Sequence, residues 1–200
     1  MDTFPLDSTA WHQIAARLHD AGKDYAASHE PHMAIVATAA LMAQELHAGQ
    51  VDKAGCDYFS GHLCAVALSG TTWQEMAVGF LHDAAEDTPH TTQEIFNRLK
   101  HEVMLCHEQH PQRTYCPTIA EWQEVGDALL CLNSLTATSR EAYIARFAGH
   151  RLACAVKIND LKHNMDISRI PHPTAHDLAR LARYQAEHTA ISTYLTRCTE

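Results

Sequence analysis

Apolar residues return every three or four positions along most of the chain, which is the spacing of amphipathic helices. Ala, Leu, Gln and Glu recur in these stretches, whereas the alternating pattern of strands is scarce. The pattern predicts helices over about 9–20, 32–48, 60–69, 72–85, 92–109, 119–132, 140–149, 151–163 and 174–196. We therefore expect an all-α fold, a single helical bundle of about eight to ten helices.

Residues that start helices precede several of these ranges. Ser8, Thr71 or Thr72, and Ser139 stand where a hydroxyl can accept hydrogen bonds from amides of the first helical turn. The prolines after the N-terminal segment fall between the predicted helices, where they interrupt no helical hydrogen bond. No repeat or linker divides the chain, so we expect one domain over 1–200, with the least patterned stretch, about 101–117, as a candidate insertion.

Composition narrows the class of protein. The formal net charge is −9 and no block of Lys or Arg occurs, which argues against a nucleic-acid partner. No apolar run reaches the roughly 18 residues that a membrane helix needs, and the N-terminus lacks the features of a secretory signal, so we expect a cytoplasmic protein without a membrane partner. The seven cysteines contain no CxxC pair and are expected to be reduced. The sixteen histidines direct attention to metal ligation.

One segment concentrates ionisable side chains at the end of an apolar helix: His82, Asp83, Glu86 and Asp87. Within one helix, spacings of three and four residues gather all four on one side of the helix end. Three acids and an imidazole placed so closely repel one another unless protons or a cation neutralise them. The segment therefore predicts a metal site.

Two further segments supply candidate ligands. Asp160 lies beside the apolar face of a predicted helix, with Asn164 one turn later, and His62 opens another apolar helix. Added to His82 and Asp83, they make a set of two imidazoles and two carboxylates. Such a set suits a six-coordinate divalent ion such as Mn²⁺, with positions left for water and substrate. The predicted chemistry is metal-assisted hydrolysis of a phosphoester or pyrophosphate.

The spacing of His62, the His82–Asp83 pair and Asp160 resembles the H…HD…D pattern of the HD-domain metal-dependent phosphohydrolases. Longer segments are similar to the hydrolase domain of the RelA/SpoT alarmone enzymes, and most of all to its free-standing members, the small alarmone hydrolases. These segments are 47–55, 82–88, 135–147 and 156–170, and the similarity spans about residues 32–190.

The resemblance implies an all-helical HD domain that binds one Mn²⁺ through those four ligands. The implied reaction removes the 3′-pyrophosphate of guanosine tetra- or pentaphosphate and releases GDP or GTP. By the same resemblance Glu86 and Asp87 handle the attacking water, and Asn164 and Lys53 contact the nucleotide. Three more positions fit the family pattern as substrate contacts: Tyr143, Arg146 and Arg169.

Two departures from the family pattern concern recognition of the base. Asp52, itself a candidate substrate contact, stands where the family usually has an Arg that stacks on guanine. The spacing from Tyr58 to His62 is one residue longer than the common form. Because a planar cation is missing at position 52, adenosine alarmones stay open as the substrate.

Other functions also stay open at this point. The same ligand set could serve a nucleotide phosphomonoesterase, and a protein outside the enzymes could be a nucleotide-binding antitoxin or sensor. A second metal site in the His- and Cys-rich stretch 101–116 is disfavoured because its spacings fit no zinc signature. The oligomeric state is not readable from the pattern.

Overall fold

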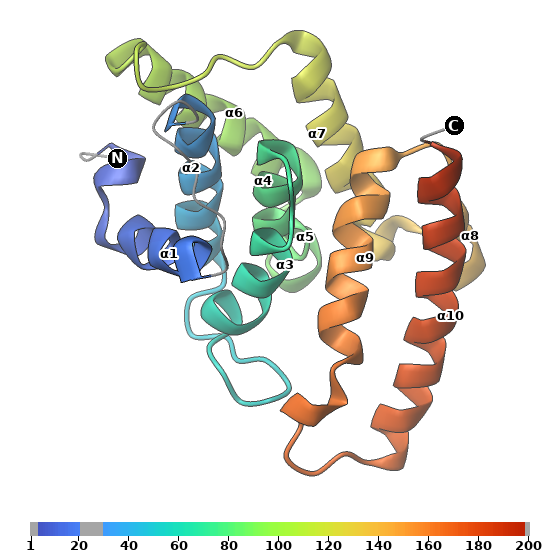
Figure 1. Cartoon of the computed structure of the whole chain (residues 1–200). Coiled ribbons are helices and arrows are strands. Elements are labelled where there is room, and N and C mark those ends of the chain that lie inside the picture. The colour runs from blue at the N-terminus through green and yellow to red at the C-terminus, as the bar shows by residue number, and fades with distance from the viewer. Residues whose placement is uncertain (1–3, 21–29, 199–200) are drawn as a thin grey trace.

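The computed structural model describes residues 4–20 and 30–198, and in these two ranges the chain is all-α and contains no strand (Figure 1). An isolated antiparallel bridge between Val51 and Asp57 closes the loop after the second helix. None of the described helices is long and apolar enough to cross a membrane. The α-helices are α1 (Thr9–Asp20), α2 (Glu30–Leu46), α3 (Cys64–Leu68), α4 (Trp73–Leu81), α5 (Ala84–Asp87), α6 (Thr92–Gln109), α7 (Ile119–Leu132), α8 (Arg140–Ala145), α9 (Arg151–Met165) and α10 (Ala175–Arg197).

Short turns of other helix types join these elements. They are the 3₁₀ turns η1 (Pro5–Asp7), η4 (Ser134–Thr136) and η5 (Ile167–Arg169), and the π-helical turn η3 (Phe59–Leu63). The predicted helix over 60–69 is therefore a π turn that runs directly into α3. A π turn widens the backbone, and such turns are frequent at functional sites.

Hydroxyl side chains begin most of the helices, as the sequence predicts for three of them. The Ser8 hydroxyl accepts from the amide of Trp11, the Thr72 hydroxyl from that of Glu75, and the Ser139 hydroxyl from that of Ala142. Full capping boxes, in which the third helical residue also binds back to the cap, start α6, α7 and α10. These caps satisfy amides that have no partner inside the helix.

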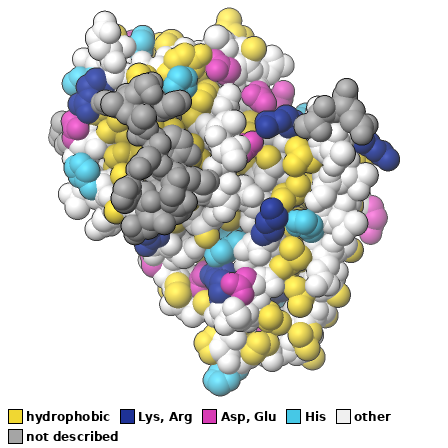
Figure 2. Space-filling view, in the orientation of Figure 1, with side chains coloured by type: hydrophobic (Ala, Val, Ile, Leu, Met, Phe, Trp, Pro, Cys, Tyr) yellow, Lys and Arg dark blue, Asp and Glu magenta, His cyan; other side chains and the backbone are white. Residues whose placement is uncertain are grey.

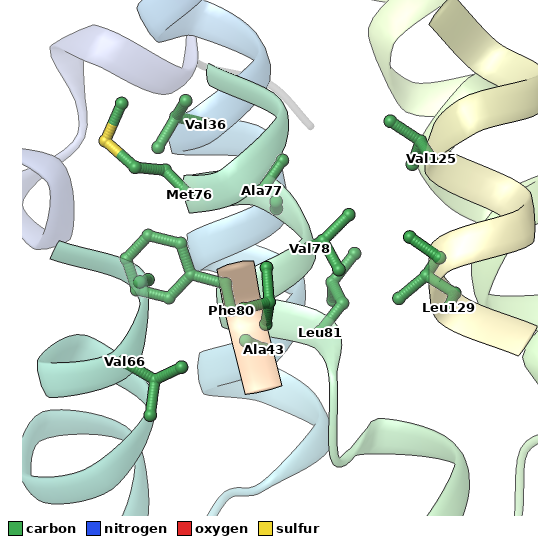
Figure 3. Close-up of a cluster of buried hydrophobic side chains, with 14 of the residues drawn as sticks. Val36, Ala43, Val66, Met76, Ala77, Val78, Phe80, Leu81, Val125 and Leu129 are labelled. Atoms are coloured by element: carbon green, nitrogen blue, oxygen red, sulfur yellow. The ribbon is translucent and has the colours of Figure 1, made fainter. Parts of the chain in front are cut away.

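The core surrounds α4, which has buried side chains on both sides (Figure 3). Met76 and Phe80 point toward α2 and α3, whereas Val78 and Leu81 point toward Leu129 and its neighbours on α7. All four α4 side chains are no more than 1 % exposed. Because α4 is buried from Glu75 to Leu81, the residues that follow it begin in the interior of the domain.

Gly79 lets α3 and α4 approach at backbone distance. A Cβ at this position would lie 2.7 Å from the Cα of Ala67 and 3.1 Å from its amide nitrogen. Backbone atoms cannot rotate away as a side chain can, so this crossing needs glycine. The crossing holds α3, which follows His62, against α4, which precedes His82.

The predicted single helix over 72–85 is wrong, because α4 ends at Leu81 and His82 and Asp83 form a turn before α5. The imidazole of His82 donates from Nδ1 to the carbonyl oxygen of Gly79 at 2.7 Å, and Asp83 has φ −95° and ψ −6°. A side chain that bonds the carbonyl three residues earlier competes with the helical amide ladder. The four ionisable residues of this segment therefore lie on a turn and a short helix instead of one continuous face.

The C-terminal helices form one edge of the bundle (Figure 1). α10 runs along α9 in the opposite direction, and Arg140 of α8 joins it through two hydrogen bonds to Glu187, of 2.8 and 2.6 Å. The candidate insertion at 101–117 is in large part helical, because α6 continues to Gln109 before a loop leads to α7. The start of α10 and the end of α9 stand next to the loop after α2, which places three distant segments around one cavity.

Candidate metal centre

The four ligands expected from the sequence come from three elements that meet beneath the loop after α2. His62 lies in η3, His82 and Asp83 in the turn after α4, and Asp160 in α9. Nε2 of His62 and Nε2 of His82 lie 3.2 and 3.0 Å from Oδ2 of Asp83. Oδ1 of Asp160 is 3.4 Å from the first nitrogen and 3.8 Å from the second.

These separations fit a shared divalent cation. Neighbouring donors about 2.1 Å from one octahedral ion are separated by about 3.0 Å. Ligand atoms of His62, His82 and Asp83 all lie within 4.8 Å of one another, with Asp160 at the edge of the group. The two histidines and Asp160 are each 4 % exposed, so the group is buried and its charges need compensation.

His82 is oriented as a metal ligand is. Its Nδ1 is engaged by the Gly79 carbonyl, and its Nε2 is buried without an aligned hydrogen-bond partner although the Asp83 carboxylate is 3.0 Å away. A ligating histidine usually donates its other ring N–H in this way. Burial opposes protonation of the ring, but the charge of Asp83 and contacts with Asp160 outweigh it and raise the pKa of His82 to about 10. Nε2 therefore faces a position that requires positive charge.

Asp83 is also held by Tyr58, which reaches the same carboxylate oxygen as the two histidines. The phenol donates to Oδ2 of Asp83 at 2.6 Å. Burial of the phenol and the charge of Asp83 raise the pKa of Tyr58 well above its usual range. Although burial alone would raise the pKa of Asp83, the adjacent imidazoles of His82 and His62 hold it well below its ordinary value. Asp83 therefore stays ionised and Tyr58 stays a donor.

Asp160 is held by two neighbours on its own helix. Lys157 donates from Nζ to Oδ2 at 2.6 Å, and Asn164 donates to Oδ1. Burial opposes ionisation of Asp160, but the charge of Lys157 and contact with His82 lower its pKa. Asp160 and Tyr143 in turn raise the pKa of Lys157 despite its burial. Lys157 was not among the residues predicted from the sequence, although its position three residues before Asp160 was a usable signal.

His62 is held by a chain of side chains that leads away from the cluster. Its Nδ1 lies 2.8 Å from Nδ1 of His163, and that nitrogen lies 3.0 Å from a guanidinium nitrogen of Arg169. Arg169 in turn pairs with Asp52 in the loop after α2. Burial and the adjacent charges of His62 and Arg169 lower the pKa of His163 to about 4. His163 was not among the residues predicted from the sequence.

Glu86 and Asp87 lie on the wall of a pocket of about 360 Å³ that opens above the cluster. Oε1 of Glu86 accepts from the amide of Ser134 at 2.6 Å, which fixes the carboxylate against η4. Asp87 is at the open edge, and loss of hydration together with the charge of Asp83 raises its pKa. Both carboxylates are thus next to the space in front of the candidate ligands.

Several Lys and Arg residues that are far apart in the sequence lie together at the pocket. Six of the fifteen Lys and Arg residues of the chain line it: Lys53, Arg140, Lys157, Arg169, Arg180 and Arg183. On the face shown in Figure 2 Lys and Arg side chains stand apart from one another, without a continuous basic patch among the described residues. Tyr184 stands between Arg183, 5.2 Å from its ring centroid, and Lys53, 6.0 Å from it. α10 therefore supplies a cationic and aromatic wall that no sequence motif indicated.

The structure brings most of the predicted substrate contacts to this pocket and leaves two outside its lining. Asp52, Lys53, Asn164 and Arg169 line it, whereas Tyr143 and Arg146 do not. The side chain of Tyr143 is 1 % exposed, and its phenol donates to the carbonyl of Leu132 at 3.0 Å. Arg146 donates to the Thr136 hydroxyl at 2.8 Å and to backbone carbonyls around η4. Both residues brace the segment after α7.

The His- and Cys-rich stretch 101–116 forms no comparable group in the described part of the chain. His107 uses Nδ1 to contact the carbonyl of Thr114 at 2.9 Å, which closes the loop after α6.

No protein-family model matches the sequence, and no curated protein matches it.

Proposed function

We propose that the chain is a metal-dependent phosphohydrolase of the HD type, and that its substrate is a purine nucleotide carrying a 3′-pyrophosphate. The observation that supports the proposal is the meeting of two imidazoles and two carboxylates at a pocket whose lining also includes six Lys and Arg side chains, among as many carboxylates. Candidate ligands alone would suit many metal proteins. The Lys and Arg side chains of the pocket next to these ligands favour a substrate with several negative charges.

Four residues would hold the metal, for which we propose Mn²⁺: His62, His82, Asp83 and Asp160. A divalent cation bound there would activate water and neutralise charge on a phosphoryl group. Mixed nitrogen and oxygen donors without a thiolate suit such an ion.

The chain's own residues supply the rest of the proposed reaction. Glu86, fixed by the Ser134 amide, orients the attacking water at the pocket wall. Asp87, whose raised pKa makes it a better base than an ordinary carboxylate, takes the proton of that water and returns it to the leaving oxygen. Lys53 and the arginines of α10 bind the phosphates that do not react.

The resemblance of 82–88 and 156–170 to small alarmone hydrolases makes guanosine tetra- or pentaphosphate the first substrate to test, with GDP or GTP and pyrophosphate as products. The adenosine alarmone is the second. It is favoured by Asp52, which pairs with Arg169 in place of offering a planar cation to guanine.

A product assay tests this proposal. Metal-stripped protein is incubated with guanosine and adenosine tetraphosphates, with and without Mn²⁺, and the products are resolved by anion exchange. We expect Mn²⁺-dependent release of GDP or ADP together with intact pyrophosphate. Turnover of simple phosphomonoesters alone would replace the alarmone proposal with a phosphomonoesterase. Tight nucleotide binding without turnover would indicate a binding module instead.

Variants separate metal binding from proton transfer. Asp83→Ala should lose both Mn²⁺ binding and turnover. Asp87→Asn, which removes the proposed base, should keep the metal and lose about 10²–10⁴-fold in rate. Glu124→Gln, on the exposed face of α7, is the matched control and should behave as the unmodified protein. Normal Mn²⁺ binding and activity in Asp83→Ala would refute the site assignment.

A further inference from the structure

The two candidate histidine ligands are anchored in different ways. His82 donates from Nδ1 to a backbone carbonyl within its own turn, at 2.7 Å. His62 instead faces the imidazole of His163, with 2.8 Å between the two Nδ1 atoms, although His163 is 101 positions later in the chain. An imidazole nitrogen can either donate or accept, so this contact needs a further partner to decide its direction.

Arg169 decides that direction. Its guanidinium lies 3.0 Å from Nδ1 of His163 and can only donate, so Nδ1 of His163 must be an acceptor. The proton in the 2.8 Å contact therefore belongs to Nδ1 of His62, and both donors share the one lone pair of the His163 nitrogen. With Nδ1 protonated and turned away, His62 presents Nε2 to Asp83 and Asp160.

Asp52 extends the chain of contacts to the loop at the pocket mouth. Its Oδ2 pairs with Arg169, and its Oδ1 accepts from the amides of Ala54 and Cys56 at 2.9 and 3.0 Å. The same carboxylate thus shapes the loop and holds the guanidinium. Gly55 supports that turn with a φ of +79°, a conformation that side chains rarely adopt.

We infer that Asp52, Arg169 and His163 form a relay of positioning residues that fixes the ring of His62 with Nε2 toward the metal centre. The inference rests on the proposed metal site and adds to it a dependence on residues that touch no metal. In this relay Asp52 serves ligand orientation, which explains an acidic residue at a position where a base contact was expected. A partner that orients a metal-bound histidine typically contributes about 10–100-fold to metal affinity.

The experiment uses the full chain and two readouts. Calorimetric titration of the metal-free protein measures the dissociation constant for Mn²⁺. Proton NMR of ¹⁵N-histidine-labelled protein detects the Nδ1 proton of His62 in the downfield region of the spectrum, because a buried hydrogen bond protects this proton from exchange. We expect His163→Phe to weaken Mn²⁺ binding by about 10–100-fold and to lose that proton signal.

Conservative variants distinguish positioning from general packing. Because Asn places an amide oxygen near the position of imidazole Nδ1, His163→Asn should recover the proton signal and most of the affinity. Asp52→Asn keeps an oxygen for the loop amides and should weaken Mn²⁺ binding by a smaller factor. Arg98→Gln, which removes an ion pair to Glu45 outside the pocket lining, is the control and should leave both readouts unchanged.

Each outcome decides the inference. A protected Nδ1 proton that persists in folded His163→Phe, or Mn²⁺ affinity that does not change in that variant, overturns it. Absence of the proton in the unmodified protein overturns it as well. If the unmodified protein binds no Mn²⁺, the proposed metal site fails, and the proton signal still decides whether the relay holds the ring.

Discussion

Replacing Gly79 by Ala tests whether the crossing of α3 and α4, next to the candidate metal ligands, is as close as the structure has it. The added Cβ would lie 2.7 Å from the Cα of Ala67 and 3.3 Å from its Cβ. Since a backbone atom is the obstacle, α3 and α4 must separate to admit the methyl group. His62 lies just before α3 and His82 just after α4, so the same separation would pull the two candidate ligands apart.

The expected magnitude follows from two opposing terms. Alanine in place of glycine favours a helix interior by about 1 kcal/mol. Overpacking of a close-packed site costs about 1–3 kcal/mol and more where the backbone must shift. Taking the upper end for a backbone contact, we expect a net loss of about 2 kcal/mol. For a chain of this length that loss lowers the melting temperature by about 4–8 °C.

Gly126→Ala is the matched control, because Gly126 also lies inside a helix. A Cβ there would meet the ring of Phe96 at 3.1 and 3.2 Å, and a ring edge can swing aside. We expect this variant to range from unchanged to about 1 kcal/mol more stable. Urea denaturation, monitored by circular dichroism, measures the free energy of unfolding of both variants. Equal stability of Gly79→Ala and the unmodified protein would show that the crossing is looser than described.

Three further predictions concern the centre and its supports. Lys157→Met leaves the Asp160 carboxylate without its buried cation and should destabilise the metal-free protein by roughly 3–5 kcal/mol, and by less in Mn²⁺. Urea denaturation in chelator and in Mn²⁺ measures the two losses of stability. Equal losses would contradict metal binding at Asp160. Tyr143→Phe removes the phenol that donates to the Leu132 carbonyl, so it should cost about 1–3 kcal/mol of stability, measured by the same method, and leave KM unchanged. A raised KM would show that Tyr143 contacts the substrate after all. Since the pKa of His82 is about 10 in the metal-free chain, the ring is protonated below that pH and must lose its proton to bind Mn²⁺. Binding near pH 7.5 should therefore release about one proton and tighten as pH rises, which calorimetry in buffers of different ionisation enthalpy measures, and no proton release would argue against His82 as a ligand.

Local pattern predicted the helices well because each has its own apolar stripe and its own cap. α6 and α7 have the predicted bounds, and Thr72 and Ser139 cap the helices that follow them. The break after Leu81 escaped prediction because it depends on a side-chain bond from His82 to Gly79. Residue spacing alone does not show such competition within a turn.

Only part of the candidate site could be predicted from the sequence, for the same reason. His62, His82, Asp83 and Asp160 could be chosen because their residue types and order were informative, and the structure places them together. The wall formed by α10 could not, because Arg183 and Tyr184 belong to an ordinary amphipathic helix until tertiary packing turns them toward the pocket. His163 was overlooked for a related reason, since its partner His62 is remote in the sequence.

The order in which these elements leave the ribosome has a consequence for how the protein matures. Asp160 follows His62 by 98 positions, and α10, which closes the pocket, is the last described helix. During synthesis the N-terminal part of a domain is exposed first, so the packing of α2, α3 and α4 can precede the arrival of α9. A nascent chain at that stage carries two imidazoles and one carboxylate at an open edge, without the fourth ligand and without Lys157. The proposed metal site would therefore be completed late in translation, and a truncated product that keeps its apolar core would still lack it.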